Sequence, residues 1–377
     1  MSGLVVLAAG GTGGHLFPAR ALAAELKSRG RTLVLVTDHR GAGFGDSLGD
    51  VAVHTVRAAA VTGRGLLGRL GGLANVALGV FQARRLLARL RPSGVVGFGG
   101  YASVPAVLAA AQLGLPTVIH EQNAVLGRAN RLLAPRARAI ATSFAETSRL
   151  AAADQARAEH TGNPVRQEVA AIGEKPYPAP QPGEPLSILI TGGSQGAAVM
   201  THVVPGALSS LSGQPPRHRL RVVQQCRPED VDRARATYRT AGIEAEVAAF
   251  FDDLPARLGA AQVVIARAGA STVAELTAAG RPAILVPLPT ATDDHQSAKA
   301  RTLEAAGGGW VMDQDGFTPE ALAARIAELR DRPDRLAAAA ANAKAAGAPQ
   351  AASHLADLVE RCMPCHSDRH SPGEMAA

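Results

Sequence analysis

The first residues in the chain that could do chemistry form a glycine loop that ends in a histidine. The apolar run Leu4–Ala9 has the length of a strand, and the segment GGTGGH, residues 10–15, separates it from a helix-like stretch. In α/β proteins this plan binds phosphate, because free backbone N–H groups and the positive end of the helix dipole meet at the helix N-terminus. The sequence therefore predicts a phosphate compound at this loop, with the imidazole of His15 beside it.

Five further segments at the ends of apolar runs carry glycine, amide, carboxylate or basic residues. Ligands of open parallel sheets bind outside the carboxyl ends of the strands, so we expect these loops to form a site. GGSQGA repeats the strand, glycine loop and helix plan in the second half of the chain. The segments are GFGGY (97–101), HEQN (120–123), GGSQGA (192–197), RAGAST (267–272) and DDHQ (293–296).

Apolar strands alternate with helical stretches along the chain, which predicts parallel sheets with helices on both faces. Residues 173–185, GEKPYPAPQPGEP, interrupt this pattern with glycines and prolines that neither a helix nor a sheet interior tolerates. We therefore expect an α/β protein of two Rossmann-like domains that face a shared cleft. The expected strands are Leu4–Ala9, Thr32–Thr37, Gly94–Phe98, Thr117–His120, Ala139–Thr142, Ser187–Thr191, Leu220–Gln224, Val263–Ala266 and Ala283–Pro287.

The length, charge and cysteine content of the chain limit the classes of function that it can have. A chain of 377 residues is longer than a domain with one hydrophobic core usually is, so two domains are expected. Residues 1–166 carry 19 Lys and Arg against 8 Asp and Glu, which indicates an anionic partner. Nucleic acid is disfavoured as that partner, because the sequence has no aromatic platform and no nucleic-acid-binding motif. Three cysteines make no disulfide framework, and no secretory leader precedes Leu4, so a reducing cytoplasm is expected.

Three interpretations that rest on common sequence patterns fit this sequence poorly: a transmembrane helix, a dinucleotide-binding fingerprint and a P-loop. The uncharged stretch 95–119 is long enough to span a membrane, but its glycines and prolines favour a strand, a turn, a short helix and a strand. The dinucleotide fingerprint G-x-G-x-x-G could begin at Gly11, but Leu16 stands where its last glycine is required. Asp38, after the second strand, would suit the acidic position of that fingerprint. GGSQGA lacks the Lys-Ser or Lys-Thr of a P-loop. One glycine loop could be a tight turn without a ligand, but two at matching positions weaken that alternative.

Seven segments together are more specific than any one of them. The sequence resembles the MurG family, the UDP-N-acetylglucosamine transferases of peptidoglycan synthesis, from about residue 10 to residue 300. Each motif alone is weak, but the seven occur in the order of that family. They are GGTGGHLFPA (10–19), GFGGY (97–101), HEQN (120–123), GNPVR (162–166), GGSQGA (192–197), RAGASTVAEL (267–276) and DDHQ (293–296).

The resemblance implies a GT-B fold and transfer of N-acetylglucosamine (GlcNAc) from UDP-GlcNAc to undecaprenyl-pyrophosphoryl-MurNAc-pentapeptide (lipid I), which gives lipid II. The product linkage is β-1,4, so an α-linked donor reacts with inversion, which needs a base and stabilisation of the departing diphosphate. No cofactor and no metal ion are expected, since a helix dipole and Arg267 would replace the ion. Two alternatives stay open: a related enzyme with another lipid acceptor, and a non-catalytic UDP-sugar-binding scaffold of the division machinery.

By this resemblance, most donor contacts come from the second domain. The N–H groups around Ala270–Thr272 would meet the UDP phosphates, with Arg267 adding charge. Glu275 would bind both ribose hydroxyls; without the family it would be a solvated glutamate on a helix. The backbone of Phe251 would read uracil. The expected UDP-GlcNAc contacts are Thr12, Gly13, Gly14, Asn123, Arg166, Ser194, Phe251, Ala270, Ser271, Thr272, Val273, Ala274, Glu275, His295 and Gln296.

The first domain would bind the acceptor. His15 is the best candidate for the general base, because the reacting hydroxyl would lie beside the acceptor diphosphate. A histidine that only hydrogen-bonds phosphate is the alternative. Glu121 and Asn123, at a neighbouring strand end, are the competing polar groups. The expected acceptor contacts are Gly10, Gly11, Thr12, Gly13, Gly14 and Tyr101.

Two features depart from the family pattern. Lys299 stands where relatives usually have Asn, close to Gln296 and His295, which would hold sugar hydroxyls. The tail has a C-x-x-C-H haem-attachment pattern with a further histidine, which together could offer four zinc ligands, but a disordered tail is the prediction. These tail residues are Cys362, Cys365, His366 and His370.

We expect two domains with different roles, followed by a short helix and a tail. Residues 1–166 form the acceptor and membrane-facing domain, 167–345 the donor domain, 346–361 a helix that packs back on the first domain, and 362–377 the tail. Residues 64–91 mix apolar residues and arginines without an acidic residue. This pattern suits peripheral binding to the anionic cytoplasmic face of the inner membrane, or else a core-facing helix with a solvated basic face. Cell-wall synthesis and division proteins are further possible partners.

Overall fold

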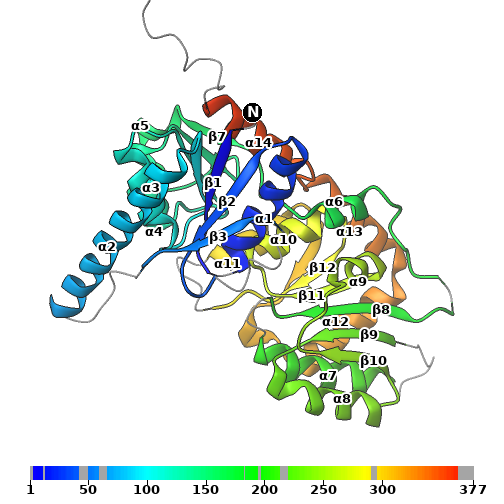
Figure 1. The fold of residues 1–377 in the computed structure, drawn as a ribbon. Helices are drawn as coiled ribbons and strands as arrows, with labels where there is room; N and C mark the ends of the chain where they lie inside the picture. The colour runs from blue at the N-terminus through cyan, green and yellow to red at the C-terminus, as the bar shows by residue number, and fades with distance from the viewer. Residues whose placement is uncertain are drawn as a thin grey trace, which may run out of the picture. The chain divides into compact units, whose positions relative to one another are not determined.

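The computed structural model describes residues 3–11, 13–41, 50–58, 66–181, 183–193, 197–212, 220–289 and 295–363. The chain divides into two compact units. The first joins Met1–Pro164 to Gln350–Ala377, and the second is Val165–Pro349. Each unit is built on one parallel sheet (Figure 1).

The sheet of the first unit has the strand order β3-β2-β1-β4-β5-β6-β7. Its central strand β1 is apolar on both faces: Val5 and Leu7 pack under α1 and α14, whereas Val6 and Ala8 pack under α2 and α3. The elements are β1 (Leu4–Ala8), α1 (Gly13–Ser28), β2 (Thr32–Thr37), β3 (Ala52–Thr55), α2 (Leu66–Leu90), β4 (Gly94–Gly97), α3 (Ser103–Gln112), β5 (Thr117–Glu121), α4 (Arg128–Leu133), β6 (Ala139–Thr142), α5 (Ala152–Gln155), β7 (Ala158–His160) and α14 (Ala351–Cys362).

The second unit repeats this plan with the strand order β10-β9-β8-β11-β12-β13. Its central strand β8 again alternates: Ile188 and Ile190 belong to one apolar core cluster and Leu189 to the other. The elements are α6 (Gln167–Gly173), β8 (Leu186–Thr191), α7 (Ala198–Ser212), β9 (Leu220–Gln225), α8 (Val231–Thr240), β10 (Glu244–Ala248), α9 (Leu254–Ala260), β11 (Val263–Ala266), α10 (Ala270–Ala278), β12 (Ala283–Leu285), α11 (His295–Ala305), β13 (Gly309–Val311), α12 (Pro319–Asp331) and α13 (Pro333–Ala345).

The α/β class with two Rossmann-like parallel sheets is confirmed, and all nine expected strands are present. Four strands were not predicted, namely β3, β7, β10 and β13, and each is the outermost strand of its sheet. The stretch 95–119 folds as β4, α3 and β5, as expected. No helix in the described part of the chain is long and apolar enough to cross a bilayer.

The helix α14 lies against α1 (Figure 1). The guanidinium of Arg29, the residue directly after α1, donates hydrogen bonds to Asp357 Oδ1 (2.6 Å), Glu360 Oε2 (2.9 Å) and Ser353 Oγ (2.8 Å). Arg31 donates to the other oxygen of Glu360 at 2.8 Å. One arginine therefore holds three side chains of the last helix beside the first one.

The last helix ends at Cys362, whose side chain is buried in the core of the first unit. The prediction of a disordered tail is wrong for Cys362, which is a helical residue because its side chain continues the apolar face of α14. Burial raises the pKa of its thiol. Cys365, His366 and His370 lie outside the described residues, so a disordered tail stays a prediction for residues 364–377.

We expect Arg29→Met to lower the free energy of unfolding by about 2 kcal/mol, because it leaves the carboxylates of Asp357 and Glu360 without their shared donor. Urea unfolding measures this loss. Lys27→Met is the matched control: Lys27 is exposed in the last turn of α1, two residues before Arg29, and its replacement should change stability by less than about 0.5 kcal/mol. Equal losses in the two variants would contradict the role assigned to Arg29.

The Arg29→Met effect should also depend on pH. Burial alone would raise the pKa of Glu360, but its hydrogen bonds with Arg29 and Arg31 outweigh burial and lower it below 4.5. A carboxyl group whose pKa is lowered on folding stabilises the protein above its unfolded pKa and loses that contribution in acid. The difference between wild type and Arg29→Met should therefore shrink as the pH falls below about 4.5.

Candidate active site

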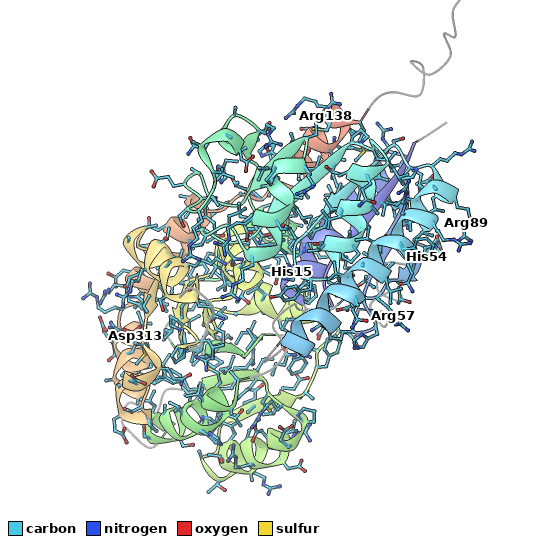
Figure 2. The ribbon with its side chains drawn as sticks, turned by 90° about the vertical axis from the view of Figure 1, so that its left-hand side faces the viewer. His15, His54, Arg57, Arg89, Arg138 and Asp313 are labelled. Carbon is cyan, nitrogen blue, oxygen red and sulfur yellow. The ribbon has the colours of Figure 1, made fainter. Side chains whose placement is uncertain are left out.

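Three strand ends bring GGTGGH, GFGGY and HEQN together in the first unit. β1 pairs with β4, and β4 pairs with β5, all in parallel, so the residues after their carboxyl ends emerge next to one another. Gly10 and Gly11 follow β1, and α1 begins at Gly13, which places His15 in its first turn (Figure 2). Sequence reasoning predicted these loops, and the structure makes them neighbours.

The ring of His15 lies over the two glycines that follow β4. Gly99 and Gly100 have φ values of +78° and +71°, a left-handed conformation that favours glycine. A Cβ atom on Gly100 would lie 3.1 Å from Cδ2 of His15 and 3.2 Å from Cα of Gly10. Position 100 therefore needs glycine both for its backbone conformation and for the space beside the imidazole.

Two oxygens hold the inner edge of the imidazole of His15. Its Nδ1 lies 2.8 Å from the carbonyl oxygen of Phe98 and 3.2 Å from Oε1 of Gln122. Burial lowers the pKa of His15, and Arg40 acts in the same direction, while Glu121 and the two hydrogen bonds oppose them. With this lowered pKa the ring is neutral at neutral pH, the form in which histidine accepts a proton.

The carboxylate of Glu121 is surrounded by N–H groups of the loop that follows β5. Oε1 accepts from the backbone and side-chain nitrogens of Asn123 at 3.0 and 2.9 Å. Oε2 accepts from the Gly127 N–H at 2.9 Å and from Nδ2 of Asn130 at 2.8 Å. Glu121 is only 2% exposed. This geometry suits a residue that orders the HEQN loop, and it favours His15 over Glu121 as the base.

His120 and Gln122 were not singled out from the sequence, although both lie in the HEQN motif. His120 is fully buried, and its Nε2 lies 3.1 Å from the carbonyl oxygen of Gly162. Burial lowers the pKa of His120 to about 4; the neighbouring His15 acts in the same direction, while Gly162 and Glu121 oppose it. The sequence feature that could have identified both residues is their position at the end of a buried strand.

The N-terminus of α10 is the candidate anion site of the second unit. Gly269 occupies the N-cap position and supplies no side-chain cap, so the first N–H groups of the helix depend on other partners. Oγ of Ser271 is buried and has no hydrogen-bond partner among the described residues. A helix N-terminus with an unused hydroxyl group is suited to bind phosphate.

Arg267 precedes this helix and is held by neutral oxygens. Its guanidinium donates to the carbonyl oxygens of Val286 (3.1 Å) and Pro287 (3.0 Å) and to Oε1 of Gln314 (2.6 Å). In the part of the chain that the structure describes, the hydrogen-bond partners of this guanidinium include no carboxylate. Burial lowers its pKa. An anion at α10 would supply the missing opposite charge.

Arg166 and Glu275 form an ion pair that the sequence did not reveal. Nε of Arg166 donates to Oε1 of Glu275 at 3.0 Å, and Nη2 donates to Oε2 at 3.1 Å. The side chains are 14% and 16% exposed, so the pair is largely shielded from water. Two residues expected to bind one ligand are therefore fixed to each other in advance.

Three further expected residues have defined places in the second unit. Phe251 is buried, and the guanidinium carbon of Arg257 lies 4.1 Å from the centre of its ring. Oε1 of Gln296 accepts from the backbone N–H of Leu288 at 3.0 Å, which orients the amide. Lys299, on α11, is only 3% exposed.

The comparisons with known proteins cover both units. The model of the glycosyltransferase family 28 N-terminal domain matches residues 5–142, and that of the family 28 C-terminal domain matches residues 187–355. A Rhodospirillum centenum protein is 58% identical over 355 residues, which are 94% of this chain and 93% of that protein. It is named UDP-N-acetylglucosamine–N-acetylmuramyl-(pentapeptide) pyrophosphoryl-undecaprenol N-acetylglucosamine transferase.

A Rhodospirillum rubrum protein of the same name is 55% identical over 375 residues, 99% of this chain and 95% of its own. The crystal structure of Acinetobacter baumannii MurG has a TM-score of 0.75 and 30% identity, and it covers 96% of this chain and 100% of its own. The chain belongs to the MurG family. The family resemblance expected from the seven motifs is confirmed.

The motifs of the MurG family divide between the two units. In the first unit the structure describes Gly10, Gly11, Gly13, Gly14, His15, Tyr101, Glu121 and Asn123; in the second it describes Arg166, Phe251, Arg267, Ala270, Ser271, Thr272, Val273, Ala274, Glu275 and Gln296. Thr12 and Ser194 lie outside the described residues, as does the side chain of His295. Within the described chain, no three His, Cys, Asp or Glu side chains gather as a metal site requires.

We expect His120 to titrate with a pKa of about 4, because burial opposes its charged form. Because the unfolded ring has a pKa of about 6.5, stability should fall as the pH drops from 6.5 towards 4, by up to about 3 kcal/mol. NMR titration of the ring protons measures the pKa, and the signals lost in His120→Phe identify the residue. A midpoint near 6.5 would contradict the burial of this ring.

Proposed function

We propose that this chain transfers GlcNAc from UDP-GlcNAc to the 4-hydroxyl of MurNAc in lipid I, with inversion at the anomeric carbon, and so forms lipid II in peptidoglycan synthesis. The identity of 58% over 94% of the chain, to a relative whose name states a GlcNAc transfer of this kind, carries the proposal. The glycine loop after β1 and the segment that leads from β11 to α10 both follow strand ends of the parallel sheets, which supports it further.

UDP would bind at the N-terminus of α10. The N–H groups of Ala270–Thr272 and the hydroxyl of Ser271 are suited to the phosphate oxygens, and the diphosphate would pair with Arg267. As the bond between the sugar and the diphosphate breaks, negative charge grows on the leaving phosphate. The helix dipole and Arg267 would stabilise that charge, the task that a metal ion performs in other transferases.

Glu275 would hold the ribose of UDP. Its carboxylate already accepts two hydrogen bonds from Arg166, but each oxygen keeps a further lone pair for a ribose hydroxyl. Because the ion pair holds the carboxylate in place, little side-chain freedom remains to be lost when UDP binds. The backbone of Phe251 would read uracil, and Gln296 would hold sugar hydroxyls.

The first glycine loop would bind the diphosphate of lipid I, with Gly13, Gly14 and Tyr101 among its contacts. The reacting hydroxyl of MurNAc would then lie beside His15. Nε2 of His15 would take the proton of that hydroxyl while its oxygen attacks the anomeric carbon and UDP departs. The neutral form of His15, favoured by its lowered pKa, is the one that this step requires.

One incubation tests the proposal. The protein is mixed with labelled UDP-GlcNAc and a lipid I analogue, and the products are separated. A lipid II-like product together with released UDP supports the proposed transfer. Turnover only with a different lipid acceptor would indicate a related transferase, and UDP-GlcNAc binding without turnover would indicate a scaffold; either result would overturn the proposal.

Glu275→Ala should raise the KM for UDP-GlcNAc by about 10- to 100-fold, because it removes the contact with both ribose hydroxyls. Steady-state kinetics with saturating acceptor measure this change. Glu168→Ala is the control, since Glu168 is exposed on α6 in the same unit and should leave the donor KM unchanged. An unchanged donor KM in Glu275→Ala would remove this residue from the site.

His15→Ala should lower kcat by about 10²- to 10⁴-fold if His15 is the base. His354→Ala, which removes an exposed histidine from α14, should leave kcat unchanged. A loss confined to the KM of the acceptor would instead assign His15 to diphosphate binding, because the chemical step would then proceed without it.

We further propose that α2 binds the anionic cytoplasmic face of the inner membrane. Leu78 and Phe81 are 46% and 57% exposed, and Arg85 lies over the ring of Phe81 at 5.6 Å. Residues 51–120 contain seven arginines and no acidic residue. Apolar side chains flanked by arginines suit an anionic bilayer surface, where each charge contributes about 1 kcal/mol.

The surface between α2 and β3 extends this basic face. Two adjoining hollows of about 360 Å³ each share Thr55, Val56 and Gln82. Their other lining residues include His54, Arg57 and Arg89, labelled in Figure 2, together with His39 and Arg85. The side chains of Leu66, Leu67, Arg69, Leu70 and Leu73, and the whole of Arg64, lie outside the described residues.

Binding to anionic vesicles should weaken with added salt and again when Arg84, Arg85 and Arg89 become Gln, because both changes reduce the attraction of the basic face for phosphate groups. Vesicle sedimentation measures binding, and the affinity for UDP-GlcNAc should not change. The control triple, Arg221, Arg301 and Arg332 to Gln, removes the same charge from exposed positions of the second unit. Vesicle binding that changes neither with added salt nor in the variant with Arg84, Arg85 and Arg89 replaced would contradict the proposal.

A further inference from the structure

A chain of hydrogen bonds runs from His15 into the interior of the first unit. Nδ1 of His15 contacts Oε1 of Gln122, Nε2 of Gln122 contacts Nδ1 of His120, and Nε2 of His120 contacts the carbonyl oxygen of Gly162. The three distances are 3.2, 3.2 and 3.1 Å. Gln122 and His120 are buried, at 2% and 0% exposed, so protein groups and not bulk water decide which atoms carry protons.

The carbonyl of Phe98 fixes the orientation of the Gln122 amide. A carbonyl oxygen only accepts hydrogen bonds, so the amide atom 2.8 Å away from it must be the nitrogen, Nε2. The amide oxygen is then the atom that faces His15. This assignment follows from the chemistry of the partners and does not depend on distinguishing oxygen from nitrogen by shape.

The same two oxygens decide which nitrogen of His15 carries the proton. Nδ1 faces the Phe98 carbonyl and Oε1 of Gln122, which are both acceptors, so the hydrogen of the neutral ring must sit on Nδ1. We infer that Gln122 is a positioning residue that holds neutral His15 in the Nδ1–H tautomer, which leaves the lone pair of Nε2 for a substrate hydroxyl.

His120 keeps Gln122 in the required orientation. The Gly162 carbonyl requires a hydrogen on Nε2 of His120, so Nδ1 of the neutral ring is an acceptor for Gln122. Protonation of His120 would turn Nδ1 into a second donor against the amide N–H groups. The lowered pKa of His120, about 4, keeps this ring neutral at neutral pH.

Other charged groups near His15 do not replace Gln122. Glu121 raises and Arg40 lowers the pKa of His15, but neither is its hydrogen-bond partner in the described part of the chain. The oxygens of Glu121 are engaged by Asn123, Gly127 and Asn130. The carboxylate of Asp38 is bound by Arg40. The imidazole is thus oriented by neutral oxygens, and among the described residues no carboxylate is its hydrogen-bond partner.

NMR of the imidazole nitrogens in the intact protein tests the tautomer without any substitution. The His15 signals are those missing from His15→Asn. At a pH above the pKa of His15 we expect a protonated Nδ1 and an unprotonated Nε2. A protonated Nε2 would overturn the inference. This measurement does not involve turnover, so it is independent of the proposed function.

Gln122→Met tests the role of the amide, because it keeps the length of the side chain and removes its hydrogen bonds. We expect part of the Nε2–H tautomer to form and kcat to fall roughly tenfold, with little change in either KM. Gln112→Met, the same change at the exposed end of α3, should alter neither. Gln122→Asn, which is one methylene shorter, is the second variant should Gln122→Met fail to fold.

The tautomer of His15 and kcat are separate readouts. The tautomer tests this inference alone, whereas the expected change in kcat also rests on the proposed function. An unchanged tautomer and an unchanged kcat in both Gln122 variants would overturn the positioning role. A shifted tautomer with an unchanged kcat would uphold the positioning role and remove His15 as the base. A shifted tautomer with a lowered kcat supports both.

Discussion

The site of the first unit depends on the backbone carbonyl of Phe98. The N–H of Phe98 donates to the carbonyl of Ala8 at 2.8 Å, which ties the end of β4 to the end of β1. The Phe98 carbonyl then accepts from both His15 and Gln122. Because parallel pairing fixes this oxygen, the sheet itself sets the position of the imidazole, and the glycines around it provide the space.

The polar groups of the two units lie in different electrostatic surroundings. In the first unit, buried histidines and amides satisfy one another and stay neutral, so the surroundings favour a proton acceptor. In the second unit, Arg267 is a half-buried cation held by carbonyl groups, and the hydroxyl of Ser271 at the N-terminus of α10 has no hydrogen-bond partner among the described residues. Under the proposed transfer, the neutral imidazole would take the proton of the attacking hydroxyl, and Arg267 would stabilise the charge that grows on the departing diphosphate.

The sequence was most informative where burial is complete. Central strands such as β1 and β8 are mostly apolar and were predicted, whereas the edge strands β7 and β10 carry exposed glutamates and were missed. The loops of the site follow predicted strands, so their residues could be named in advance. Their pairings could not: Arg166 meets Glu275, and Gln122 joins His15 to His120, through contacts that only the folded sheet creates.

The return of the chain to the first unit has a consequence for how the protein is made. Leu355, Leu358 and Val359 of α14 belong to the same apolar core as Val5 and Leu7 of β1. The first strand to leave the ribosome therefore cannot complete its burial until the last helix has been synthesised, while the sequence of the second unit is already complete. During synthesis, the apolar face awaiting α14 is exposed, and the second unit has the opportunity to fold first.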